Sequence, residues 1–114
     1  MISGFDIGNH LIHLKTACGY FRLLKIASER LEDFAYVIFD YNGSDLELII
    51  PESYEGYKIT AIVAKAFKGS KIQKLIMPNT ITLIGNEAFA NCRDLNETVI
   101  SNKLELIPDN SFEN

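Results

Sequence analysis

Tryptophan is absent from this sequence, and cysteine and histidine occur only twice each in 114 residues. The two cysteines, Cys18 and Cys92, lie 74 positions apart and have no partner at metal-ligand spacing. Small proteins that depend on disulfides carry more cysteines, and cysteines that bind a metal lie close together in the sequence. The pattern therefore predicts two free, partly buried thiols and no Cys18–Cys92 disulfide.

The two histidines, His10 and His13, are three positions apart and would share one face of a helix. A structural metal usually takes four ligands, so the pair alone predicts no metal site. Nucleophilic catalysis needs a base and an orienting group beside the nucleophile, and no glycine cluster here resembles a phosphate-binding loop. We expect no cofactor and no enzymatic activity.

Long apolar runs are also missing. No stretch approaches the roughly 18 apolar residues of a membrane span, and the first residues lack the basic start and apolar core of a signal peptide. The sequence as given predicts a single soluble, cytoplasmic domain without a membrane partner; a surface or secreted location is the alternative if it belongs to a longer protein.

Charge of neither sign dominates. Fifteen acidic and eleven basic residues give a net charge of −4, which does not favour direct nucleic-acid binding. Five lysines but no acidic residue lie between Glu55 and Glu87, so a basic middle separates two acidic ends. These bands predict solvated faces or, as the sharper interpretation, a partner with complementary charge.

A repeated pattern organises most of the chain. The stretch 81–92 (ITLIGNEAFANC) has counterparts at 59–67 and 104–112. Ile62, Ile84 and Ile107 are separated by 22 and 23 positions, and so are Phe67, Phe89 and Phe112. A period in the low twenties predicts a solenoid in which these six side chains form two columns.

Residues 1–33 do not follow this period, and we expect them to form an N-terminal cap on a solenoid of residues 34–114. Apolar residues three or four apart favour a helix with Asn9 as its N-cap, although Gly19 weakens that prediction and leaves a broken helix or a hairpin open. The apolar positions are Leu11, Leu14, Cys18, Phe21, Leu24 and Leu31.

A β-hairpin is predicted where the solenoid begins. Residues 36–41 and 46–50 are rich in β-branched and aromatic side chains, and Asn42-Gly43 between them is a dipeptide typical of tight hairpin turns.

One short strand is expected in each turn, at 48–50, 75–77 and 98–100. Side chains alternate along a strand, so one set faces the core and the other faces outward. The predicted core set is Leu48, Ile50, Leu75, Met77, Thr98 and Ile100, together with Ile59, Ile62, Phe67, Ile72, Ile81, Ile84, Phe89, Leu95, Leu104 and Ile107.

Taken together, Ile-Thr-x-Ile-Gly-x-x-Ala-Phe at 81–89, Asn91-Cys92-x-x-Leu95 and the strand ending in Pro78 resemble the BspA-like leucine-rich repeat family. The copies depart from the family pattern at Gly69-Ser70, Val63, Thr98 and Ser101. The resemblance implies a curved or nearly straight solenoid. Together with the spacing in residues 1–33 and the predicted hairpin, the expected fold class is α+β repeat: a short right-handed leucine-rich-repeat solenoid of about three turns with a helical N-terminal cap and a β-hairpin entry. The resemblance also implies protein–protein or cell-surface adhesion without enzymatic activity.

The outward-facing residues of the three strands are the candidate partner-binding surface. They form an apolar stripe beside a charged row, unless the N-terminal segment folds over them. The six residues are Glu47, Ile49, Lys74, Ile76, Glu97 and Val99.

The C-terminal end of the solenoid is a second candidate, because an open end exposes core. Leu104, Leu106, Ile107 and Phe112 would then mediate self-association as a homodimer, unless the natural chain continues.

The leading hypothesis is a non-enzymatic protein-protein interaction module that binds through the exposed sheet. The alternative is a small acidic inhibitor, similar to anti-CRISPR proteins, that occludes a site on a nucleic-acid-handling enzyme.

Overall fold

A computed structural model describes residues 11–27, 33–108 and 110–112. The proposed N-cap Asn9 and His10 of the histidine pair lie outside these residues. The described residues form two β-sheets and contain no helix. No helix among them is therefore long and apolar enough to cross a membrane.

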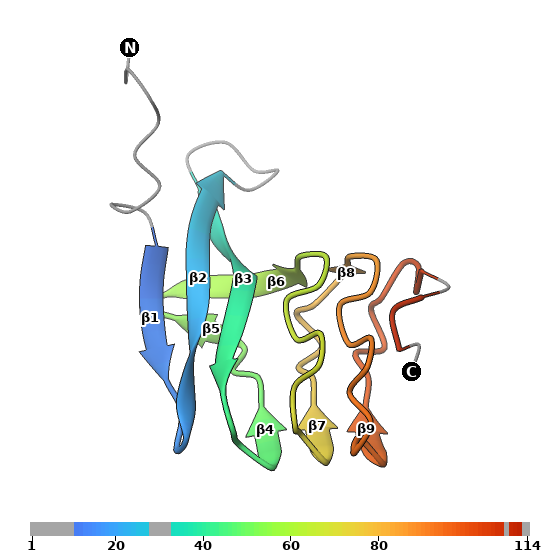
Figure 1. Cartoon of the computed structure of the whole chain (residues 1–114). Coiled ribbons are helices and arrows are strands. Elements are labelled where there is room, and N and C mark those ends of the chain that lie inside the picture. Colours follow the sequence, from blue (N-terminus) through green and yellow to red (C-terminus); the bar gives the residue numbers. More distant parts are fainter. Residues whose placement is uncertain (1–10, 28–32, 109, 113–114) are drawn as a thin grey trace, which may run out of the picture.

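The larger sheet has six strands (Figure 1). Their order is β1-β2-β3-β6-β5, and β8 also pairs with β6. The strands are β1 (Leu11–Lys15), β2 (Gly19–Ala27), β3 (Phe34–Gly43), β5 (Ser53–Tyr54), β6 (Tyr57–Ile62) and β8 (Leu83–Ile84).

The smaller sheet has three parallel strands that lie side by side at the lower edge of Figure 1: β4 (Glu47–Ile49), β7 (Lys74–Ile76) and β9 (Glu97–Val99). Each strand begins a new coil of the chain. Leu48 pairs with Leu75, and Leu75 with Thr98. This register confirms the alignment of one short strand per turn.

The predicted aromatic column is confirmed. Phe67, Phe89 and Phe112 stack with ring centroids 4.9 and 5.0 Å apart and nearly parallel planes. Tyr41 extends the column upstream, with its ring 5.3 Å from that of Phe67. Offset stacking at these distances contributes about 1 kcal/mol per pair beyond the burial of apolar area. One ring per coil thus holds the coils in register.

Most predicted core positions are buried, including Ile59, Ile62, Ile72, Leu75 and Ile81. Ile62 and Ile84 are neighbours in the parallel pair of β6 and β8, as the isoleucine column requires. Ile100 and Ile107 were wrongly assigned to the core, since they are 38% and 44% exposed. Both lie on the last described coil, where no described residue packs over them.

The helical prediction for the N-terminal segment is wrong. Its residues form the antiparallel pair β1–β2, in which Leu14 lies opposite Phe21 and Leu11 opposite Leu24. The backbone N–H of Thr16 donates to the carbonyl of Gly19 and closes the turn. Spacings of three and four were misleading because the turn at Ala17-Cys18 reverses the chain, so apolar residues on two strands imitate a helical period.

The hairpin predicted at Asn42-Gly43 is also wrong, because both residues continue β3 and pair with Tyr20 and Gly19 of β2. A Cβ on Gly19 would lie 2.3 Å from the carbonyl oxygen of Asn42, so the glycines permit close backbone contact here. The tight two-residue turn occurs instead at Glu55-Gly56, between β5 and β6, where both residues have positive φ.

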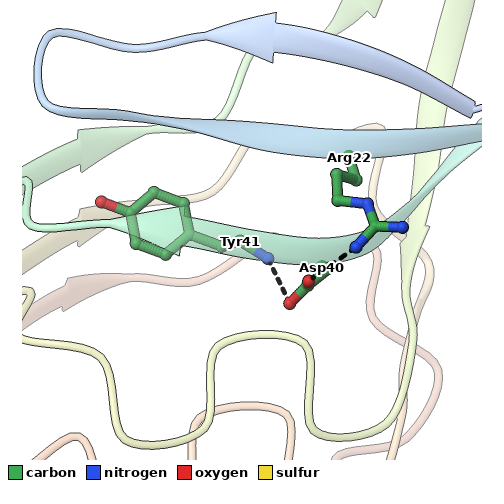
Figure 2. A network of polar contacts seen from close by, with 3 residues as sticks. All are labelled: Arg22, Asp40 and Tyr41. Carbon is green, nitrogen blue, oxygen red and sulfur yellow. Dashed lines mark hydrogen bonds and ion pairs between the residues drawn. The ribbon is translucent and has the colours of Figure 1, made fainter.

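A β-bulge between Arg22 and Leu23 bends β2 against β3. Figure 2 shows the polar contacts beside it. Arg22 lies opposite Asp40 and forms an ion pair with its carboxylate at 3.4 Å, and the backbone N–H of Tyr41 donates to the same carboxylate at 2.9 Å.

The buried carboxylate of Asp45 connects the N-terminal hairpin to the first coil. It accepts hydrogen bonds from the Thr16 hydroxyl, the backbone N–H of Cys18 at 2.9 Å and the Tyr41 hydroxyl at 2.6 Å. Burial would raise the pKa of Asp45, but these hydrogen bonds outweigh it and hold the pKa below its ordinary value. Burial, followed by the hydrogen bond to Asp45, raises the pKa of Tyr41 to about 12.

This connection predicts a pH dependence of stability. Because the folded-state pKa of Asp45 is lowered, its contribution is present above the unfolded-state pKa near 4 and is lost as the pH falls through the folded-state value. Asp45→Asn should therefore cost about 1–3 kcal/mol at pH 7 and flatten the acid limb of stability. Urea unfolding between pH 2 and 7 measures this, with Asp94→Asn on the exposed surface as the control. Parallel acid limbs in wild type and Asp45→Asn would contradict it.

Close contact between coils gives a second prediction. A Cβ on Gly85 would lie 2.3 Å from the backbone nitrogen of Ala64 in the preceding coil, so Gly85→Ala should push the coils apart and cost about 1–3 kcal/mol. Gly69→Asn is the matched control, because nothing lies near its added Cβ and Asn91 already adopts positive φ at the corresponding place in the next coil. Thermal melts should show a clear loss for the first variant and little change for the second; equal losses would refute the close-contact explanation.

Candidate binding surface

The three parallel strands place all six predicted surface residues in two rows. Glu47, Lys74 and Glu97 are direct neighbours across the sheet, and so are Ile49, Ile76 and Val99. Neighbouring strands are about 4.8 Å apart, so each row spans roughly 10 Å.

The apolar row lies on the outer face of the sheet. Ile49 is 67% exposed and Val99 51% exposed, while Ile76 between them is half-buried. The alternating residues Leu48 and Leu75 are buried beneath. The described part of the N-terminal segment does not cover this row, since it forms β1 and β2 of the other sheet. We call Ile49, Ile76 and Val99 the apolar stripe.

The charged row has the order acid, base, acid. Lys74 forms an ion pair with Glu97 at 3.4 Å, and Glu47 forms no ion pair within the described part of the chain. Such solvent-exposed pairs contribute less than about 1 kcal/mol to stability. The row therefore does little for folding and remains open to external charges.

The four C-terminal candidates are not part of the three strands of this sheet. Leu106 is 69% exposed and Ile107 44% exposed, whereas Leu104 and Phe112 are half-buried. Of these four, Phe112 lines a hollow of about 320 Å³ at the end of the aromatic column. The other lining residues are Phe89, Cys92, Leu95, Asn96, Thr98 and Ile100.

A groove that the sequence analysis did not predict crosses the larger sheet, with a volume of about 480 Å³. Its lining includes exposed Ile26, Phe34 and Leu83, with Val37 at its floor. The Lys25 ammonium lies 4.4 Å from the ring centroid of Tyr57 and 5.1 Å from that of Phe34. One residue could have indicated this groove from the sequence. Leu83 directly precedes the core residue Ile84, and neighbouring side chains on a strand face opposite sides, so Leu83 must lie on the outer face.

Both thiols are free, as predicted, and Cys92 is buried. The expected partial burial of Cys18 is wrong, because Cys18 is exposed at the turn between β1 and β2. The Cys92 thiol donates to the carbonyl of Phe67 at 3.1 Å and lies 3.3 Å from the hydroxyl of Ser70, its counterpart in the preceding coil. Its role is therefore packing between coils. Across the described ranges, no three histidine, cysteine, aspartate or glutamate side chains gather as a metal site would require.

The parallel strands and stacked coils define a leucine-rich repeat solenoid. Comparison with known families specifies it further: a model described as BspA type leucine-rich repeat region (6 copies) matches residues 24–114. The chain belongs to this family. Leucine-rich repeat families typically mediate protein–protein interaction on a repeat scaffold.

Solved structures agree on the fold. A leucine-rich repeat protein from T. pallidum superposes with a TM-score of 0.62 at 19% identity, covering 87% of this chain and 40% of that one. One from Bacteroides capillosus gives a TM-score of 0.62 at 23% identity, covering 81% and 67%. A leucine-rich cell surface protein from Faecalibacterium prausnitzii gives 0.55 at 20% identity, covering 81% and 24%.

The chain spans 40% of the length of the T. pallidum protein. A search of curated proteins found no significant match.

The thiol environments give a third prediction. Cys18 should react with a thiol reagent within minutes, and Cys92 should react only after unfolding, because the thiolate is the reactive form and Cys92 is enclosed by the coils. Counting modified thiols by mass spectrometry with and without denaturant measures this. Cys18→Ser is the control and should leave the native protein unmodified; rapid labelling of that variant would disprove the burial of Cys92.

Proposed function

We propose that this protein is a non-enzymatic binding module that recognises another protein through the outer face of β4, β7 and β9. The observation that supports it best is the apolar stripe. Ile49 and Val99 would each gain by moving out of water, since burying a large aliphatic side chain contributes about 1.5–3 kcal/mol. Neither side chain is needed for the core, so their exposure has no role in folding.

The rigidity of the sheet supports the same proposal. Each strand is fixed by parallel pairing on the smaller sheet and by buried residues beneath, including Leu48, Leu75 and Met77. A surface that is held before binding loses little conformational entropy when a partner arrives. Family membership adds that repeat scaffolds of this kind present sheets to partners.

Substitution of exposed stripe residues tests the proposal. The double variant Ile49→Asp/Val99→Asp should fold and lose at least about 100-fold in affinity for partner proteins captured from the source organism, since apolar residues central to an interface commonly cost 2 kcal/mol or more. Captured proteins are identified by mass spectrometry and their affinity is measured with purified components.

Leu83→Asp is the matched control. It makes the same kind of substitution, with one added charge instead of two, at a residue that is 52% exposed on the other sheet. Retained binding by the stripe variant together with loss in Leu83→Asp would move the site to the groove of the larger sheet and overturn the proposal.

A second candidate is homodimerisation through Leu104, Leu106, Ile107 and Phe112. The exposure of Leu106 and Ile107 favours it, as does the position of Phe112 in the lining of the 320 Å³ hollow, because a second copy related by a two-fold axis would bury these apolar groups. Light scattering should then show a dimer that Leu106→Lys converts to a monomer. A monomer at 100 μM wild-type protein would exclude a dimer of ordinary strength.

The inhibitor hypothesis concerns the identity of the partner rather than the surface. In that hypothesis the apolar stripe and the two glutamates of the adjacent charged row cover a basic site on a nucleic-acid-handling enzyme. The acidic residues Glu47 and Glu97 are the feature that supports it.

A further inference from the structure

We propose that the surface of β4, β7 and β9 accepts an amphipathic helix that carries two basic residues about two turns apart beside an apolar column. This inference rests on the proposed function and names the chemistry of the partner. Its basis is the order and spacing of the two rows described above.

The charged row disfavours a second copy centred on the middle strand of this face. In an isologous contact centred on β7, Lys74 faces Lys74 of the other molecule. Each end of the row then brings glutamate against glutamate, whichever way the two-fold axis runs, because both ends are acidic. Like charges in a desolvated contact are unfavourable. A partner that covers all three strands at once therefore fits the row better if it is a different molecule.

The same row specifies the charge of that partner. Lys74 already has Glu97 at 3.4 Å, and Glu47 has no ion pair within the described residues. The side chain of Glu97 is 60% exposed and retains free acceptor capacity, because a carboxylate offers about four lone-pair sites. A partner with two cations, one at each end of the row, can form ion pairs with both glutamates. An acidic partner would find only Lys74, which is already paired with Glu97.

The spacing favours a helix. Residues three or four apart on a helix rise about 4.5–6 Å, which matches the separation of about 4.8 Å between neighbouring strands. A helix lying across the strands thus places one apolar residue over each member of the stripe. Residues seven apart rise about 10.5 Å, close to the roughly 10 Å between Glu47 and Glu97.

The two rows are also close enough for one helix to reach both. Glu47 and Ile49 are two residues apart on β4, a separation of about 6.5–7 Å. This is less than the helix diameter of about 10 Å with side chains. The apolar column and the adjacent basic column of one helix therefore cover the stripe and the charged row together.

A displayed library tests the inference. The probe is a helical peptide scaffold with six randomised positions on one face, selected against the purified protein. The expected result is enrichment of Lys or Arg at two positions seven apart, bordering Leu, Ile or Phe. The enriched peptide should bind Glu47→Lys/Glu97→Lys about 10-fold or more weakly than wild type and weaken with rising salt.

Controls separate the inference from the proposed function. Selection against the charge-reversed variant should enrich Asp or Glu at the same positions. Peptides without paired cations that still depend on Ile49 and Val99 would overturn the helix chemistry and leave the binding surface standing. Peptides that bind Ile49→Asp/Val99→Asp as well as wild type would overturn both.

Discussion

Stacking of one aromatic ring per coil is the constraint on which this structure depends. The column Tyr41, Phe67, Phe89 and Phe112 runs through the coils with centroid separations of 4.9–5.3 Å. That separation matches the distance between parallel strands in a sheet, so ring stacking and strand pairing favour the same register. Close backbone contact at Gly85 and the thiol of Cys92 support the same spacing. The alignment of Ile49, Ile76 and Val99 follows from it.

The N-terminal hairpin closes the other end of the column. Phe21 of β2 packs against Tyr41 and Phe67, with ring centroids 5.8 and 6.0 Å away. The hydroxyl of Tyr41 in turn binds the buried carboxylate of Asp45, which also holds the turn between β1 and β2. The hairpin is therefore joined to the solenoid by apolar contacts and by the hydrogen bonds of the buried Asp45 carboxylate. The described strands of the hairpin belong to the larger sheet and do not cover the outer face of the three parallel strands.

The repeat and its surface could be predicted from sequence because a solenoid is governed by neighbouring coils. A period of 22–23 residues aligns the phenylalanines, and short strands recurring at intervals of 27 and 23 predict one row of Glu47, Lys74 and Glu97. The N-terminal segment lacks such a repeat, and its pairing depends on contacts distant in sequence. Gly19 and Gly43 illustrate the difficulty: each is a turn signal alone, yet together they allow two strands to touch. The groove around Leu83 was likewise set by sheet topology.

Amide chemical shifts of the labelled protein, recorded while the captured partner is titrated in, test the central claim most directly. We expect the largest changes at residues 47–49, 74–76 and 97–99, in all three strands together, because the rows form one surface. Changes centred on Ile26, Phe34 and Leu83, with the three short strands unaffected, would contradict the account.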